Sequence, residues 1–128
     1  MPDPSAFDAH PLAPLAADLC DLIRAACPEL VQRKKWNAPS FGPGNEDRLT
    51  LNLSRPDRVH LILHRGAKAV DTRTGRRLLP AATGLRWATD QRADITLTSL
   101  AELGAQRDAL TRLCQQWIAA TDPAGLVN

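Results

Sequence analysis

Tyrosine is absent from this 128-residue chain, and the other aromatic residues are few, with three Trp and two Phe. No uninterrupted apolar run is long enough to cross a bilayer, so we predict no membrane span. The first ten residues, MPDPSAFDAH, have neither a basic start nor an apolar stretch, and we expect no secretory signal peptide there. These absences favour a cytoplasmic protein, and the length fits one domain of ordinary size.

Cysteine is also scarce. The three cysteines, Cys20, Cys27 and Cys114, include no C-x-x-C pair. Cys20 and Cys27 are seven residues apart in a predicted helix, which separates them by about 10 Å along its axis, too far for a disulfide bond. An odd number of thiols without metal-ligand spacing indicates buried free cysteines in a reducing compartment.

Positive charge is concentrated in the middle of the chain. The segment 48–92 carries ten basic and three acidic residues, a net charge of +7, although the whole chain has a net charge of only +2. All of these cations except Lys68 are arginine. A cationic segment of this kind can bind an anionic partner, or it can be the solvated face of a sheet.

Helical periodicity marks both ends of the predicted domain. Apolar spacing over 14–27 predicts a helix, which Pro28 should end. A second, short helix is expected over 28–33, with Leu30 and Val31 facing inward. A capping box, Ser99-Leu-Ala-Glu102, opens a last helix that runs to about residue 120. Its predicted apolar stripe comprises Leu100, Leu103, Leu110, Leu113, Cys114 and Trp117.

Alternating apolar and polar residues between these helices predict strands. The expected strands are 34–37, 49–53, 59–63, 85–89 and 94–98. Residues 38–40 are expected to bend the chain, and 66–84 to form a long irregular connection of the kind that often carries function. The order predicts an α+β fold, a two-layer sandwich with an antiparallel sheet of about five strands covered on one face. We expect one domain over 11–122, with tails at 1–10 and 123–128.

One stretch resembles a known family. KKWNAPSF, Lys34 to Phe41, is similar to the K-W-[GN]-x-P-x-F signature of the YdhG-like bacterial family. VHLILHRGAKAVD and ATGLRWATDQRADITLTSLAEL resemble two later segments of that family, in the same order. The resemblance covers 12–120, and Leu85 stands where the family often has a lysine. It implies a frataxin-like fold and a small non-enzymatic binding domain, since some members are called iron chaperones.

Iron, the one cofactor that the resemblance implies, would need surface carboxylates, because hard cations prefer oxygen ligands. Asp18 and Asp21 share one face of the first helix. Glu46 and Asp47 come just before the first hairpin strand. These four acids are the candidate iron ligands, and they can equally be ordinary solvated acids.

The alternative function is binding of a small anionic ligand or a nucleic acid through a basic sheet face. Arginine can grip phosphate or carboxylate with two hydrogen bonds, and an exposed aromatic ring can stack on a base. If the aromatic side chains are buried instead, they are simply part of the core. The candidate ligand-binding residues are Trp36, Asn37, Phe41, His60, His64, Arg65, Lys68 and Arg86.

No sequence motif predicts catalysis or a zinc site. The chain has no G-x-S-x-G elbow and no Gly-rich phosphate loop. His60 and His64 should lie about 13 Å apart on one strand, too far apart to share an ion. We therefore predict a non-enzymatic domain whose partner is a small ligand or a protein, with no membrane partner.

Overall fold

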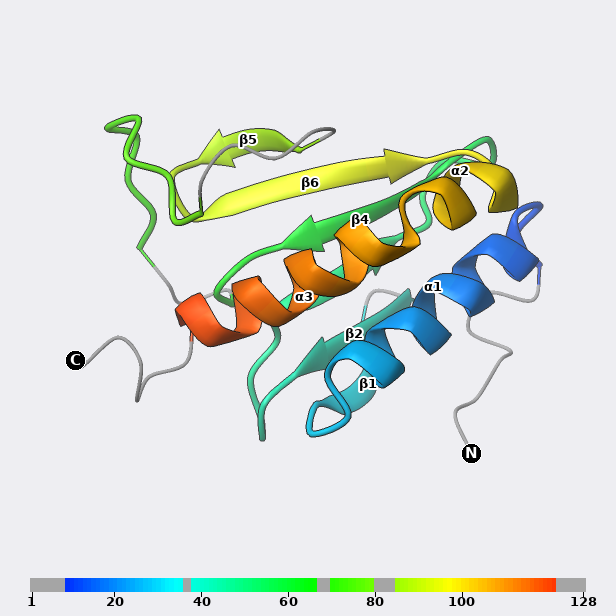
Figure 1. Cartoon of the computed structure of the whole chain (residues 1–128), viewed down its shortest axis with the longest axis horizontal. Helices are drawn as coiled ribbons and strands as arrows, with labels where there is room; N and C mark the ends of the chain where they lie inside the picture. The colour runs from blue at the N-terminus through cyan, green and yellow to red at the C-terminus, as the bar shows by residue number, and fades with distance from the viewer. Residues whose placement is uncertain (1–8, 36–37, 67–69, 80–84, 122–128) are drawn as a thin grey trace.

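The computed structural model describes residues 9–35, 38–66, 70–79 and 85–121, and these form an α+β fold of two layers. Three helices cover one face of a six-stranded antiparallel sheet (Figure 1). The helices are α1 (Ala13–Ala26), α2 (Leu100–Ala105) and α3 (Arg107–Thr121). The strands are β1 (Val31–Lys35), β2 (Ala38–Gly42), β3 (Leu49–Asn52), β4 (Val59–Leu63), β5 (Arg86–Thr89) and β6 (Arg92–Leu97). The predicted fold class is confirmed, with six strands in place of about five.

Four of the predicted strands pair as two antiparallel hairpins. β3 and β4 pair with Leu49 opposite Leu63 and Leu51 opposite Leu61, so the alternating leucines face the helices. β5 and β6 pair across a turn at Asp90. The strand order is β1-β2-β3-β4-β6-β5, so the long connection after β4 carries the chain past the place of β6 to the far edge of the sheet.

The predicted short helix over 28–33 is wrong. Val31 begins the edge strand β1, which pairs with β2 along its whole length, and the Val31 side chain is 45% exposed. A few residues of helix would gain little, because nucleation is costly, whereas β2 offers a full ladder of backbone partners. The predicted strand 34–37 overlaps β1 only at Lys34 and Lys35; Trp36 and Asn37 lie outside the described residues.

The expected bend at 38–40 is also wrong, because these residues belong to β2, which is buried along its length. Pro39 lacks a donor, but β3 pairs only with Ser40 and Phe41, so Pro39 lies beyond the part of β2 that is flanked on both sides. Phe41, one of the candidate ligand-binding residues, has a side chain that is 1% exposed and belongs to the core, so its ring is not available to stack on a ligand.

The last helix begins as expected and is interrupted later. The Ser99 hydroxyl accepts a hydrogen bond from the Glu102 N–H at 3.0 Å, and the Glu102 carboxylate accepts one from the Thr98 N–H at 2.9 Å. Gln106 then separates α2 from α3. All members of the predicted stripe are buried except Leu100, which is 50% exposed because it lies in the first turn of α2, at the rim of the helix layer.

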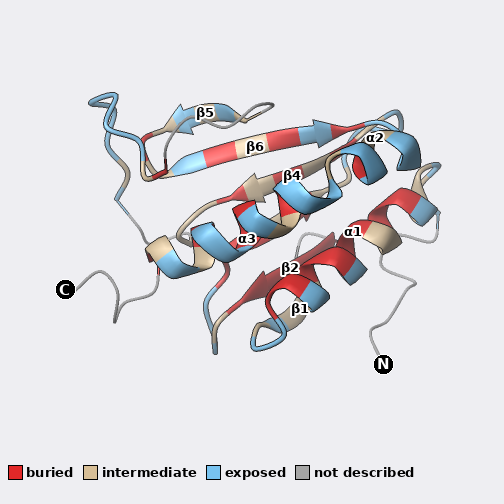
Figure 2. Ribbon diagram, viewed as in Figure 1, coloured by how far each residue is buried: buried red, intermediate tan, exposed pale blue. Residues whose placement is uncertain are grey.

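The core lies between the helices and the leucine face of the sheet (Figure 2). Trp117 of α3 is fully buried, and its indole N–H donates to the His64 carbonyl oxygen at 2.9 Å. The Trp87 ring lies 6.0 Å from the Trp117 ring and is partly covered. The three cysteines are buried, and burial raises the pKa of Cys20 and Cys114 to about 12. These thiols are therefore protonated at neutral pH and poorly reactive.

Two glycines allow a direct test of this packing. A Cβ on Gly42 would lie 1.8 Å from the Glu46 carbonyl oxygen, whereas a Cβ on Gly104 of α2 would have nothing within 4 Å. We expect Gly42→Ala to lower the free energy of unfolding by about 1–3 kcal/mol, because the added Cβ displaces the Glu46 carbonyl group. Gly104→Ala should raise it by roughly 0.5–1 kcal/mol, the helix preference for alanine. Urea unfolding of both variants checks this, and equal effects would contradict the close contact at Gly42.

Candidate functional site

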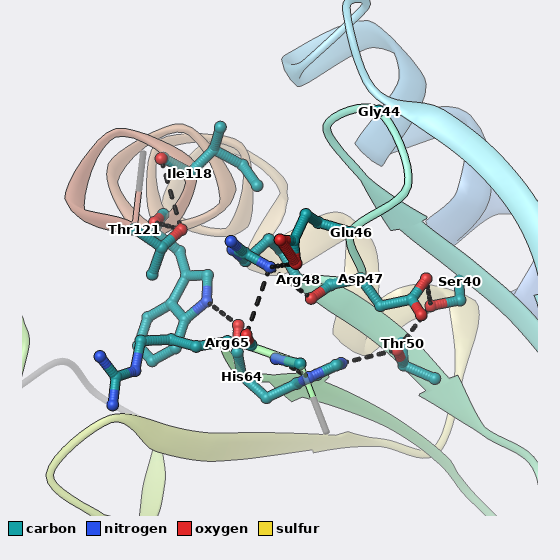
Figure 3. Close-up of polar contacts among 12 residues, drawn as sticks. Ser40, Gly44, Glu46, Asp47, Arg48, Thr50, His64, Arg65, Ile118 and Thr121 are labelled. Atoms are coloured by element: carbon teal, nitrogen blue, oxygen red, sulfur yellow. Dashed lines mark hydrogen bonds and ion pairs between the residues drawn. The ribbon is translucent and has the colours of Figure 1, made fainter. Parts of the chain in front are cut away.

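A chain of hydrogen bonds crosses the sheet on the face turned away from the helices (Figure 3). The Ser40 hydroxyl of β2 lies 2.7 Å from the Thr50 hydroxyl of β3, which lies 2.8 Å from His64 Nε2. The Gly66 N–H donates to His64 Nδ1 at 3.0 Å. Because Nδ1 accepts, a neutral His64 carries its proton on Nε2 and donates to Thr50. Ser40 in turn donates to Asp47 Oδ1 at 3.0 Å, so the chain runs in one direction.

Asp47 ends this chain at the edge of the sheet. Its carboxylate is buried and also accepts from Arg33 Nη1 at 3.0 Å. The neighbouring Arg48 is buried too, and its Nη1 donates to Glu46 Oε2 at 3.2 Å and to the Asp47 carbonyl oxygen at 3.0 Å. The fold thus brings Glu46 and Asp47 to the same corner as His64, but arginines engage both carboxylates.

Ser40 cannot act as a nucleophile in this arrangement. The Ser40 side chain is fully buried and donates to a carboxylate, so no substrate can reach it. Its clear role is to fix how β2, β3 and β4 align, because Ser40 and Thr50 are directly opposite in the sheet.

The other predicted iron ligands are occupied by arginines. Asp18 accepts from Arg107 at 2.7 Å, which joins α1 to α3, and Asp21 accepts from Arg24 at 2.5 Å. No group of three or more His, Cys, Asp or Glu side chains gathers to hold a metal ion anywhere in the described part of the chain. An iron ion at Asp18 and Asp21 would have to displace two guanidinium groups.

The predicted ligand-binding residues do not converge on one place. His60 bonds to Thr96 on the open sheet face, and Arg86 pairs with Asp94 at 3.0 Å. Arg65 pairs with Asp71 at 3.3 Å beyond the end of β4. Lys68, like Trp36 and Asn37, lies outside the described residues.

A second feature, which was not among the predicted sites, is a loop that we call the arginine loop, residues 72–77 (TRTGRR). Asp90, in the turn between β5 and β6, holds it. Its Oδ2 accepts from the Thr72 hydroxyl at 2.6 Å, the Thr74 hydroxyl at 2.8 Å and the Thr74 N–H at 2.7 Å. Its Oδ1 accepts from the Gly75 N–H at 2.9 Å. These donors hold the pKa of Asp90 at about 2, below its usual range.

The arginine loop carries positive charge that the described acids do not neutralise. Arg73, Arg76 and Arg77 are exposed, and so is Arg92 at the start of β6; none forms an ion pair with a described carboxylate. Arg77 lies over the Trp87 ring, 5.7 Å from its centre. Figure 1 shows the loop projecting beyond the β5–β6 turn, and Figure 2 shows it exposed.

Most other arginines are paired. The arginines with a carboxylate partner are Arg24, Arg33, Arg48, Arg58, Arg65, Arg86 and Arg107. Arg55 and Arg112 have no such partner either, but they lie apart from the loop, in the β3–β4 turn and on α3. Four of the six arginines without a described carboxylate partner are therefore in the loop or at Arg92, which is two residues after the Asp90 that holds the loop.

No known protein-family model matches this sequence, and neither a curated protein nor a solved structure matches it significantly. The resemblance to the YdhG-like family therefore stays a prediction. None of the helices described here is both long and apolar enough to cross a membrane.

The hydroxyl chain predicts a stability difference between two hydroxyl deletions. Ser40→Ala should lower the free energy of unfolding by about 1–3 kcal/mol, because the buried Asp47 carboxylate loses a donor. Thr96→Ala, which removes an exposed hydroxyl bonded to His60, should cost less than about 0.5 kcal/mol. Thermal or urea unfolding measures both. Similar costs for the two variants would contradict the role given to Ser40.

The bonds to Asp90 predict a dependence of stability on pH. Folding lowers the pKa of Asp90 from 3.8 to about 2, so its carboxylate stabilises the fold fully above about pH 4. That contribution is lost as the pH falls towards about 2. The stability difference between wild type and Asp90→Asn should therefore shrink over this interval, as measured by urea unfolding at a series of pH values. A difference that does not change from about pH 6 to about pH 2 would show that the charge of Asp90 is irrelevant.

Proposed function

We propose that this chain is a non-enzymatic binding domain whose ligand is a nucleic-acid strand, bound through the phosphates by the arginine loop and Arg92. The observation that carries the proposal is the contrast among the arginines. Seven arginines form ion pairs with carboxylates of the same chain, whereas the loop arginines and Arg92 form none with a described carboxylate and can pair with a bound anion. Guanidinium groups suit phosphate because they donate two parallel hydrogen bonds.

The shape of the loop favours an extended ligand over a small anion. Arg73, Arg76 and Arg77 are exposed and follow one another within six residues of a loop that projects beyond the β5–β6 turn (Figure 1). Side chains arranged in this way can contact successive phosphates of a strand, and each contact releases counterions. The guanidinium of Arg77 over the Trp87 ring also offers a flat cationic surface on which a base can stack.

Two alternatives receive less support from the described residues. Catalysis receives no support from Ser40 or the cysteines, since the Ser40 side chain is buried and the thiols are buried and protonated. Iron binding at the predicted helix ligands receives little support, since Asp18 and Asp21 are both paired with arginines. The resemblance to the YdhG-like family agrees with a binding domain, but the ligand that it implies is iron.

The proposal predicts that binding depends on these arginines and on salt. The probe is a fluorescein-labelled single-stranded DNA of about 20 nucleotides, longer than the usual site of one small domain. We expect its affinity, measured by fluorescence anisotropy, to fall steeply between about 50 and 200 mM salt. The triple variant Arg73→Gln, Arg76→Gln, Arg92→Gln should bind at least about tenfold more weakly, because it loses several phosphate contacts.

A matched control distinguishes the effect of the loop arginines from the effect of a lower net positive charge. The double variant Arg55→Gln, Arg112→Gln removes exposed, unpaired arginines elsewhere, and we expect its affinity for the DNA to fall by less than about threefold. Equal loss per arginine in the two variants, or no salt-dependent binding by the wild type, would overturn the proposal.

A further inference from the structure

We infer that Asp90 is a positioning residue that holds the arginine loop in the shape in which it binds the strand. This inference rests on the proposed function. Its basis is the set of donors that bond to the carboxylate of Asp90. The residue is 3% exposed, and its hydrogen bonds come from threonine hydroxyls and backbone N–H groups, not from an arginine.

The bonds fasten the loop along its length. The donors belong to Thr72, Thr74 and Gly75, and the Asp90 backbone adds two bonds. Its N–H donates to the Thr72 carbonyl oxygen at 2.9 Å, and its carbonyl oxygen accepts from the Leu78 N–H at 2.7 Å. The loop is thus closed on both sides of its arginines by one residue of the β5–β6 turn.

The backbone shape at the middle of the loop fits this closure. Gly75 has a φ of +86°, which an L side chain rarely adopts, and this conformation presents its N–H to Asp90 Oδ1. Asp71, just before the loop, is fastened as well, since its carboxylate accepts from Arg65 at 3.3 Å and from the Thr89 hydroxyl at 3.1 Å. Both acids are therefore bonded by donors other than Arg73, Arg76 and Arg77, so the charges of these arginines are not used to hold the loop.

The consequence for binding is preorganisation. A flexible loop would have to be ordered when the strand binds, and that ordering costs conformational entropy. With the backbone already held by Asp90, only the arginine side chains need to settle on the phosphates. An acid that instead paired with Arg73 or Arg76 would cancel the charge on which binding depends.

Charge and positioning predict opposite results for Asp90→Asn. Removing a negative charge beside a cationic site should strengthen the binding of an anion. If Asp90 positions the loop, the same change should weaken binding, because an amide presents only one acceptor oxygen where the carboxylate presents two. The sign of the change therefore distinguishes the two roles.

The test uses the labelled single-stranded DNA with the full chain. We expect Asp90→Asn to bind about three- to tenfold more weakly and with a shallower salt dependence, because fewer arginines reach phosphates together. The double variant Thr72→Val, Thr74→Val removes hydroxyl donors without changing charge and should shift affinity and salt dependence in the same direction. Asp57→Asn, in the β3–β4 turn, is the charge control and should bind as well as wild type or slightly better.

A folded Asp90→Asn variant that binds as tightly as wild type, or more tightly, would overturn the inference. If that variant does not fold by circular dichroism, the threonine variant decides by the same criterion, and unchanged affinity overturns the inference. An arginine triple variant that binds like wild type would instead overturn the proposed function. Faster trypsin cleavage after Arg73, Arg76 or Arg77 in Asp90→Asn, together with weaker binding, supports the positioning role.

Discussion

Two buried carboxylates, Asp47 and Asp90, organise the end of the sheet from which the arginine loop projects. Each is held by hydrogen bonds from segments distant in sequence, since a buried charge is tolerated only when it is fully bonded. Asp47 joins β1 to the chain of hydroxyls that crosses β2 and β3. Asp90 joins the β5–β6 turn to the arginine loop. The alignment of the strands and the shape of the loop both depend on these bonds.

The same bonds decide where positive charge remains. The carboxylates near this end of the sheet are engaged by hydroxyls, by backbone N–H groups or by arginines outside the loop. The loop arginines and Arg92 are therefore left without a carboxylate partner among the described residues. The excess of arginine in the middle of the chain thus becomes a local surface that suits an anionic partner, and the ion pairs of Asp18 and Asp21 leave little room for iron.

Local pattern was enough to predict the parts of the fold that alternate regularly. The β3–β4 hairpin, α1 and the capped start of α2 follow directly from their residues. The start of β1 and the whole of β2 could not be predicted in this way, because VQRKK and APSFG do not alternate between apolar and polar residues and Pro39 disfavours a strand. These segments form strands because β1 pairs with β2, and β2 pairs with β3.

The candidate site shows a similar division. The basic character of 48–92 was visible in the sequence, and so was the long connection that contains the loop. Which arginines stay unpaired was not visible, because that depends on partners far away in the chain, such as Asp18 for Arg107. The bonds from Thr72 and Thr74 to Asp90 span 18 and 16 residues, and only a Thr-x-Thr-Gly turn signal hints at them.

The most direct test of this account is an NMR titration that follows the arginine side-chain Nε–Hε signals while single-stranded DNA is added. The account predicts that the signals of Arg73, Arg76, Arg77 and Arg92 shift together, while those of the paired Arg24, Arg58 and Arg107 stay in place. Shifts spread evenly over all arginines, or confined to the paired ones, would contradict it.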